Sequence, residues 1–132
     1  TTVTARFGER SIHVPVTTQS IEENLPINFA NHIVPVFSKL GCNSGGCHGK
    51  ASGQNGFKLS LLGFEPTEDF EHLVKEGRGR RLFPASPDKS LLLLKPTWQL
   101  EHEGGERFAA DGPEAAVLQA WIRAGAQRAG QR

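Results

Sequence analysis

The sequence predicts one small, mostly helical domain with long loops and a short β-hairpin at its N-terminal end. The chain has 132 residues, about the size of one domain with a single hydrophobic core. Apolar residues recur at helical intervals from residue 28 onward, whereas apolar and polar residues alternate over the first twenty. Glycine and small polar residues dominate residues 42–58, which predicts a long loop there.

Composition excludes several classes of protein. Hydrophobic residues make up 37% and charged residues 22%, which are ordinary proportions for a soluble domain. The net charge of +1 gives no electrostatic reason to expect a nucleic-acid or anionic-membrane partner. The sequence contains no run of eighteen apolar residues, so it predicts no membrane span. Two cysteines are too few for a disulfide-rich scaffold. Because the chain has no methionine, we expect it to be part of a larger multidomain protein.

Residues 1–20 predict a β-hairpin. Two short β-branched runs, residues 3–7 and 11–16, flank Gly8-Glu9-Arg10. An isolated hairpin is marginal in water, so we expect it to lean on the main domain or to belong to a neighbouring one. The polar residues that follow predict a linker over 21–30, before a main domain over 31–127 and a tail over 128–132.

The first helix of the main domain is predicted from four apolar residues at intervals of four and three: Phe29, Ile33, Phe37 and Leu40. Proline inside a helix removes a hydrogen bond and clashes with the preceding turn. Pro35 therefore places the start of this helix near Asn31, with Asn31 as the N-cap. Gly41 predicts its end, directly before Cys42.

Three further helices follow along the chain. Residues 65–76 have an apolar face and predict the second helix. Ser86 as N-cap and Pro87 at the first helical position predict a short, buried helix that includes residues 90–94. Asp111-Gly112-Pro113 opens the final helix, which is predicted to stop at Gly125.

The most informative stretch is Cys42-Asn43-Ser44-Gly45-Gly46-Cys47-His48. The nearest mechanistic pattern is C-x-x-C-H, in which two cysteines form thioethers to haem and the histidine ligates its iron. Here four residues separate the cysteines instead of two. We expect Gly45-Gly46 to adopt positive φ and fold the extra length into a tight bulge.

Other interpretations of this stretch stay open from the residues alone. A Cys42–Cys47 disulfide would leave His48 as an ordinary loop histidine. A zinc site would need four ligands, and a thioredoxin-like redox pair would need a βαβ context that the sequence lacks. A large apolar cofactor would serve as the core for long loops, which favours haem.

Residues 31–126 resemble a small haem-c domain of planctomycetal type, which occurs in large multidomain proteins. The resemblance rests on Ile33-Val34-Pro35-Val36-Phe37, Gly41-Cys42-Asn43-Ser44-Gly45-Gly46-Cys47-His48-Gly49-Lys50, Gly56-Phe57-Lys58-Leu59-Ser60-Leu61, Ser90-Leu91-Leu92-Leu93-Leu94-Lys95-Pro96 and Ala120-Trp121-Ile122-Arg123-Ala124-Gly125-Ala126. It implies a class I cytochrome c-like helical fold around one covalent haem c. Cys42 and Cys47 would form the thioethers and His48 would be the proximal ligand. Residues 1–20 resemble the closing strands of a bacterial Ig-like domain.

The chain lacks the methionine that such cytochromes usually place on the distal side of the iron. The other histidines are the candidates to replace it: His13, His32, His72 and His102. His102 stands shortly before the last helix, where the resemblance places the methionine loop, and Gly104-Gly105 beside it allow close approach to a ring. We therefore predict His102 as the sixth ligand. Bis-histidine ligation lowers the reduction potential relative to methionine.

Other residues are candidates for the haem pocket. Arg80 and Arg81 suit bidentate contacts to haem propionates, although a solvated basic loop explains them equally well. Trp98 is either a pocket residue or a core residue. Trp121 is expected at the crossing of the terminal helices or against the haem edge.

The functional prediction is a monohaem c-type cytochrome domain that transfers one electron within a larger extracytoplasmic protein and is not itself an enzyme. Its redox partner is not identified by the sequence. An open or labile distal site would instead define a haem sensor or peroxidase-like module. A haem-free binding module stapled by a disulfide is the third hypothesis.

Overall fold

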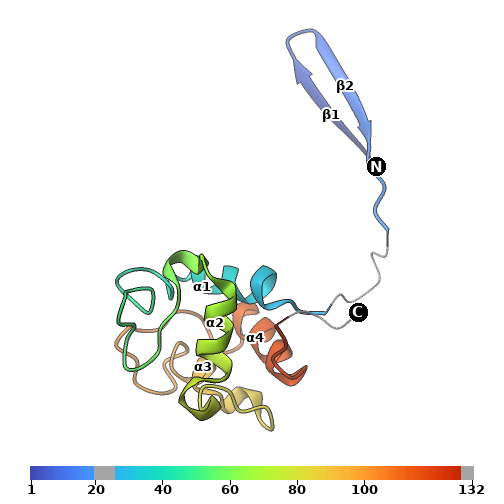
Figure 1. The fold of residues 1–132 in the computed structure, drawn as a ribbon. Coiled ribbons are helices and arrows are strands. Elements are labelled where there is room, and N and C mark those ends of the chain that lie inside the picture. Colours follow the sequence, from blue (N-terminus) through green and yellow to red (C-terminus); the bar gives the residue numbers. More distant parts are fainter. Residues whose placement is uncertain (20–25, 129–132) are drawn as a thin grey trace.

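The computed structural model describes residues 1–19 and 26–128. Half of the expected linker and most of the expected tail lie outside these ranges. The described part consists of a two-stranded hairpin and a helical body, which Figure 1 shows apart from each other.

The hairpin confirms the prediction for the first residues of the chain. Strands β1 (Thr2–Phe7) and β2 (Arg10–Pro15) pair antiparallel. Their register sets Val3 opposite Val14 and Ala5 opposite Ile12, so these apolar side chains share one face of the ribbon. Every residue of both strands is exposed, so this apolar face has no cover within the described residues.

The first helix of the body begins earlier than predicted. A π-helical segment (η1, Phe29–Ile33) leads directly into α1 (Val34–Lys39). The side-chain oxygen of Asn28 accepts the backbone N–H of Asn31 at 3.0 Å, so Asn28 is the N-cap and the prediction of Asn31 was wrong. Pro35 is tolerated because it lies in the first turn of α1. Gly41, with φ of +72°, follows the helix as predicted.

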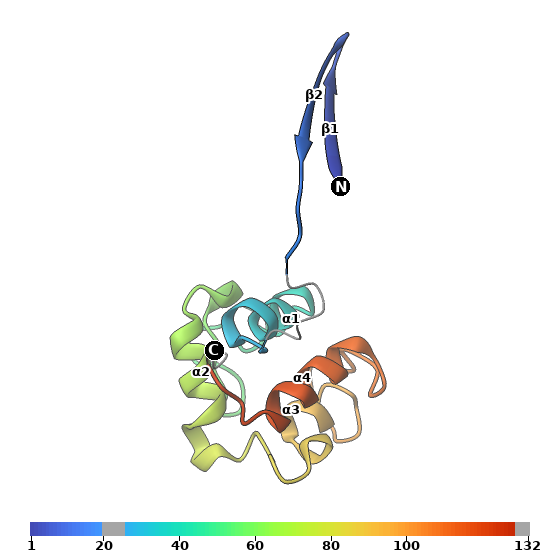
Figure 2. The same cartoon turned by 90° about the vertical axis from the view of Figure 1, so that its right-hand side faces the viewer.

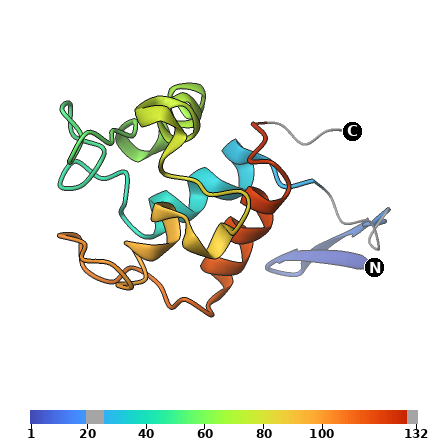
Figure 3. The same ribbon diagram turned by 90° about the horizontal axis from the view of Figure 1, so that it is seen from below.

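The remaining helices are short and joined by long irregular segments. They are α2 (Pro66–Val74), α3 (Leu91–Leu94) and α4 (Pro113–Arg123), with 3₁₀ turns at Leu61–Gly63, Glu76–Gly79 and Pro87–Lys89. Ser86 is the N-cap residue and Pro87 opens the 3₁₀ turn, as predicted, but the Ser86 hydroxyl donates to the Asp88 carboxylate and makes no bond to a backbone N–H. Figures 2 and 3 show α1 between α2 and α4.

The core surrounds Phe29, which is fully buried. Its ring centroid lies 5.4 Å from that of Phe70 on α2 and 5.4 Å from that of Trp121 on α4. Trp121 is also fully buried, and its indole N–H donates to the carbonyl of Gln127 at 2.8 Å. The expectation that Trp121 packs where the first and last helices meet is therefore confirmed.

The expectation of a mostly α, class I cytochrome c-like fold was wrong. Helical segments account for 37% of the structure, and the described residues show no haem-wrapping fold. The periodic segments do become helices, but these have only 6, 9, 4 and 11 residues. Fifteen glycines and eight prolines explain the difference, because these residues end helices and favour irregular connections.

None of the described helices could cross a membrane, since none is both long and apolar enough. The longest, α4, has 11 residues, whereas a transmembrane helix needs about 20. This agrees with the absence of a predicted span.

Candidate functional site

The loop that follows α1 carries Cys42, Cys47 and His48 and folds back on itself. The N–H of Cys42 donates to Phe37 at the end of α1 (2.9 Å), and the N–H of His48 returns to the carbonyl of Cys42 (3.0 Å). The intervening residues close a compact turn through a bond from Cys47 N–H to Ser44 (3.0 Å). The expected tight bulge is present, but Gly45 and Gly46 do not adopt the positive φ predicted for them.

The glycine that this loop requires is Gly49, which the sequence analysis did not single out. A Cβ on Gly49 would lie 2.0 Å from the carbonyl oxygen of Asn43. Backbone therefore packs directly on backbone at this point. This contact holds the backbone of the turn between Asn43 and Gly49.

Both cysteines are free thiols, and both are half-buried. Burial raises the pKa of Cys42 to about 11, although the nearby cation of Arg107 acts in the opposite direction. The Arg107 guanidinium donates to the Cys47 Sγ and to the carbonyl of Leu40, at 3.5 Å each. Arg107 thus links its own loop to the cysteine loop, a role that its position in the sequence does not indicate.

His48 is held in one tautomer. Its Nδ1 lies 3.0 Å from the carbonyl oxygen of Phe57, and a carbonyl can only accept, so Nδ1 carries the proton. Burial is the main cause that lowers the pKa of His48, and the His102 and Arg81 side chains lower it further by electrostatic repulsion. The hydrogen bond to the Phe57 carbonyl acts in the opposite direction and raises this pKa. The ring is therefore neutral, with the lone pair of Nε2 free to bind a metal.

His102 is held in the same way in the loop between α3 and α4. Its Nδ1 lies 2.9 Å from the carbonyl oxygen of Gly105, which again leaves the lone pair on Nε2. A Cβ on Gly104 would lie 2.8 Å from Cε1 of this ring, so the glycine allows the backbone to pass close by it. The expected approach of this backbone to a haem ring stays a prediction.

The rings of His48 and His102 lie near each other with almost parallel planes. Their centroids are 6.5 Å apart and the planes differ by 13°. Two imidazoles that ligate one metal through Nε2 atoms at about 2 Å each have centroids about 6 Å apart. Figures 1 and 3 show the two loops that carry these histidines on the same side of the helical body. The two rings are therefore close to each other and nearly parallel.

The other histidines have different surroundings. His13 is on the exposed hairpin, with Nδ1 2.9 Å from the Thr4 hydroxyl. His32 accepts from the backbone N–H of Asn28 at 2.7 Å. His72 is on α2, with Nε2 3.6 Å from the Glu76 carboxylate. Among the candidates for the sixth ligand, His102 is the one whose ring faces His48 at metal-ligand separation.

The remaining pocket candidates lie in contrasting places. Arg81 is only 6% exposed, and its guanidinium donates to three backbone carbonyls, at His72, Glu76 and Gly56. Arg80 is exposed. Trp98 is 54% exposed and has a φ of +59°, so a core position for it is wrong, whereas its pocket role stays a prediction.

An open groove of about 660 Å³ adjoins the cysteine loop at Gly49. Its lining includes the exposed side chains of Leu61, Leu62 and Phe64. Contiguous exposed apolar side chains are typical of surfaces that bind a ligand or a partner.

No group of three or more His, Cys, Asp or Glu side chains within residues 1–19 and 26–128 is arranged to hold a metal ion. The site thus offers two imidazoles to a metal, flanked by two thiols. No family model, curated protein or solved structure matches this chain. Its function is therefore argued from the site.

Proposed function

We propose that this chain is a monohaem c-type cytochrome domain that transfers one electron. Cys42 and Cys47 would hold the haem by two thioethers, and His48 and His102 would be the axial ligands. The observation that carries the proposal is the paired geometry of these two imidazoles, 6.5 Å apart and nearly parallel, each with Nδ1 bonded to a carbonyl.

The donor set fits a haem better than a bare metal ion. Structural metal sites such as those of zinc require about four protein ligands, and the described residues group only two imidazoles here. A haem would need only two protein ligands for its iron, and His48 and His102 would supply them. Haem in this setting would supply one-electron redox chemistry. The free thiols beside His48 are the groups that covalent attachment requires.

The residues of this chain favour electron transfer over reaction at the iron. Each carbonyl bond keeps its imidazole in the Nδ1–H tautomer, so both Nε2 atoms stay available as ligands. With both sides occupied, no position is left for a substrate or small ligand. Bis-histidine ligation places the reduction potential below that of a methionine-ligated centre.

The cellular setting follows from the same proposal. Covalent haem attachment takes place outside the cytoplasm, so the domain would work in the periplasm or an equivalent compartment. The resemblance to planctomycetal haem-c domains supports a place within a larger protein. The redox partner would then be another domain or a separate protein.

The test is to produce the chain with covalent haem attachment in a bacterial periplasm. We expect haem that survives denaturing electrophoresis and a low-spin spectrum in both redox states. The His102→Ala variant should keep its haem but become high-spin and bind carbon monoxide, whereas His32→Ala should match the wild type. A colourless protein with a Cys42–Cys47 disulfide would overturn the proposal. Carbon monoxide binding by the wild type would favour the sensor or peroxidase-like alternative.

A further inference from the structure

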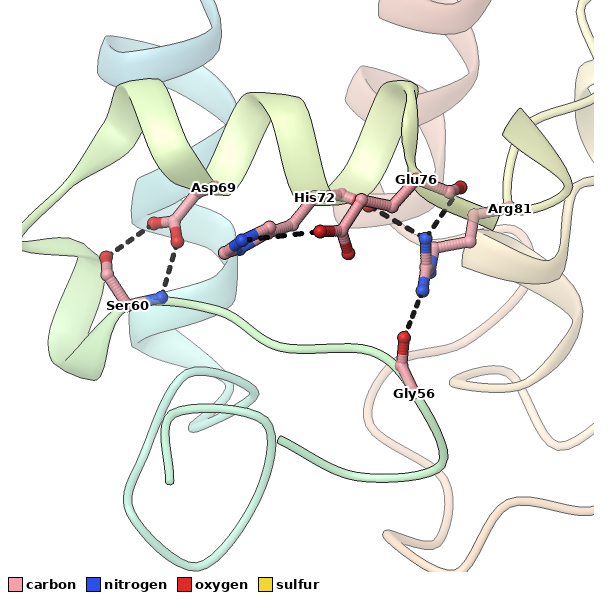
Figure 4. A network of polar contacts seen from close by, with 6 residues as sticks. All are labelled: Gly56, Ser60, Asp69, His72, Glu76 and Arg81. Carbon is pink, nitrogen blue, oxygen red and sulfur yellow. Dashed lines mark hydrogen bonds and ion pairs between the residues drawn. The ribbon is translucent and has the colours of Figure 1, made fainter. Parts of the chain in front are cut away.

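The segment before α2 is bonded at two points, to Asp69 on α2 and to Arg81 beyond the end of that helix (Figure 4). At one end, the buried carboxylate of Asp69 accepts both the backbone N–H of Ser60 (2.5 Å) and its hydroxyl (2.8 Å). At the other end, Arg81 donates to the carbonyl of Gly56 (2.5 Å). Phe57 lies between the two fastenings, directly after Gly56.

Arg81 is held rigidly at its own end. Its Nη1 donates to the carbonyls of His72 (2.8 Å) and Glu76 (3.0 Å) beside the C-terminal end of α2. A buried guanidinium is costly unless its donors are satisfied, and three carbonyls accept three of its five N–H groups here. The planar fork of arginine can reach several acceptors at fixed angles, which a lysine cannot do.

Phe57 connects Arg81 to His48 through two of its groups. The Arg81 guanidinium carbon lies 4.6 Å from the centroid of the Phe57 ring, and that ring is 4.6 Å from the centroid of the His48 ring. The backbone oxygen of Phe57 accepts from Nδ1 of His48 at 3.0 Å. The ring of Phe57 therefore sets the position of the imidazole, and its carbonyl sets the tautomer.

The segment that contains Phe57 has little regular structure of its own. Gly53 and Gly56 both have positive φ, and the regular structure consists of one isolated β-bridge between Gln54 and Phe57. The Phe57 carbonyl also accepts the Gln54 N–H at 2.9 Å, so the turn holds this carbonyl locally. Arg81 adds a bond from outside the segment at the neighbouring Gly56 carbonyl.

We propose that Arg81 is a positioning residue for His48, acting through the Gly56 carbonyl and the Phe57 ring. This replaces the role predicted for it, pairing with a haem propionate. Its consequence for iron ligation rests on the proposed function, whereas its effect on the His48 ring does not. Residues that orient a ligating histidine change metal affinity or activity by about 10- to 100-fold when mutated.

The first test uses the haem-free chain, with Arg81→Lys and its exposed neighbour Arg80→Gln as matched control. Nitrogen-15 NMR of the histidine rings reports which nitrogen of His48 carries the proton. We expect the Nδ1–H tautomer in the wild type and in Arg80→Gln, and a mixture of tautomers in Arg81→Lys. An unchanged tautomer in a folded Arg81→Lys would overturn the proposal.

A second variant covers the outcome in which Arg81→Lys does not fold. Phe57→Leu keeps the bonds of Arg81 to the backbone but removes the ring between it and His48. Because the backbone carbonyl of residue 57 stays in place, we expect His48 to keep the Nδ1–H tautomer while its ring NMR signals shift, and wild-type ring signals would overturn the proposal.

The haem-loaded protein gives an independent readout. Arg81→Lys retains the positive charge but weakens the His48 bond to the Phe57 carbonyl, which reduces electron donation to the iron. We expect a raised midpoint potential and altered low-spin electron paramagnetic resonance signals, with Arg80→Gln unchanged. Wild-type values for Arg81→Lys would contradict the positioning role. A wild-type chain that binds no haem would instead overturn the proposed function and leave the tautomer result standing.

Discussion

Two loops of this molecule each present one histidine, and they are supported very differently. The loop of residues 41–59 is bonded to the helical body along its length, at Cys42 to α1, at Asn43 to Leu62, and at Gly56 to Arg81. The loop of residues 96–108 has bonds within itself, and its bonds to other segments include those from the Leu100 N–H to Leu94 on α3 and from the Arg107 side chain to Leu40 and Cys47. Its base is joined by the bond from Arg107 N–H to Pro96 (2.7 Å), and His102 is bonded to Gly105 within the same loop.

Exposure follows the same division. Asn43 and Leu59 in the first loop are almost fully buried, whereas Trp98 and Leu100 in the second are large apolar side chains with about half their surface exposed. Local opening costs least where buried contacts are few. The His48 loop is therefore expected to be the more rigid of the two. Under the proposed function, we expect any loss of haem ligation to begin at His102.

The largest expected effect is at Gly49. In Gly49→Ala the new Cβ would lie 2.0 Å from the backbone carbonyl oxygen of Asn43, which cannot turn away as the end of a flexible side chain could. We expect a loss of about 3 kcal/mol in the free energy of unfolding, the upper end for overpacking. Urea unfolding of the haem-free chain measures it. Gly46→Ala is the control, because a Cβ there meets nothing within 4 Å. Equal losses in both variants would show that the first loop is not tightly packed.

The next effect is a loss of stability at high pH. Burial raises the pKa of Cys42 from 9.0 to about 11 in the folded chain, so the folded state retains a proton that the unfolded state releases. The stabilisation is complete below about pH 9 and is lost as the pH rises through 11. Over this range we expect the haem-free, reduced chain to lose about 2 kcal/mol. Urea unfolding at pH 8 and at pH 11 should show this for the wild type and less of it for Cys42→Ala. A Cys42→Ala variant with the full loss would place its origin elsewhere.

The sequence predicts the hairpin and the helices better than it predicts the fold class. Alternation predicts the hairpin, and helical periodicity predicts where helices occur, because both depend on neighbours along the chain. The N-cap of the first helix was predicted at Asn31, whereas it is Asn28. Pro35 implied a late start of the helix, but a π-helical segment before α1 allows the helix to start earlier. The predicted fold class was wrong because a resemblance in motifs does not determine how short helices and long loops pack.

The candidate site shows the same limit. Cys42, Cys47 and His48 are adjacent in the sequence, so their grouping is predictable, and His102 could be chosen because the chain has no methionine. Arg107, Arg81 and Phe57 were missed or given other roles, since their contacts join residues far apart in the sequence. The requirement for Gly49 was equally hidden, because it depends on where the backbone of Asn43 passes.

The smallest expected effect tests the His102 loop. A Cβ in Gly104→Ala would lie 2.8 Å from Cε1 of His102 and 3.3 Å from Nη2 of Arg107, and both of these atoms belong to side chains that can move. We therefore expect a loss of only about 1 kcal/mol in the free energy of unfolding, well below that of Gly49→Ala. The strain should be relieved by displacement of the His102 ring, seen in the haem-free chain as altered His102 ring NMR signals while those of His48 keep their wild-type positions. In the haem-loaded protein the same displacement should let carbon monoxide compete with His102. A loss as large as that of Gly49→Ala, with the His102 signals unchanged, would mean that the second loop is as rigid as the first and that the two ligands are equally fixed.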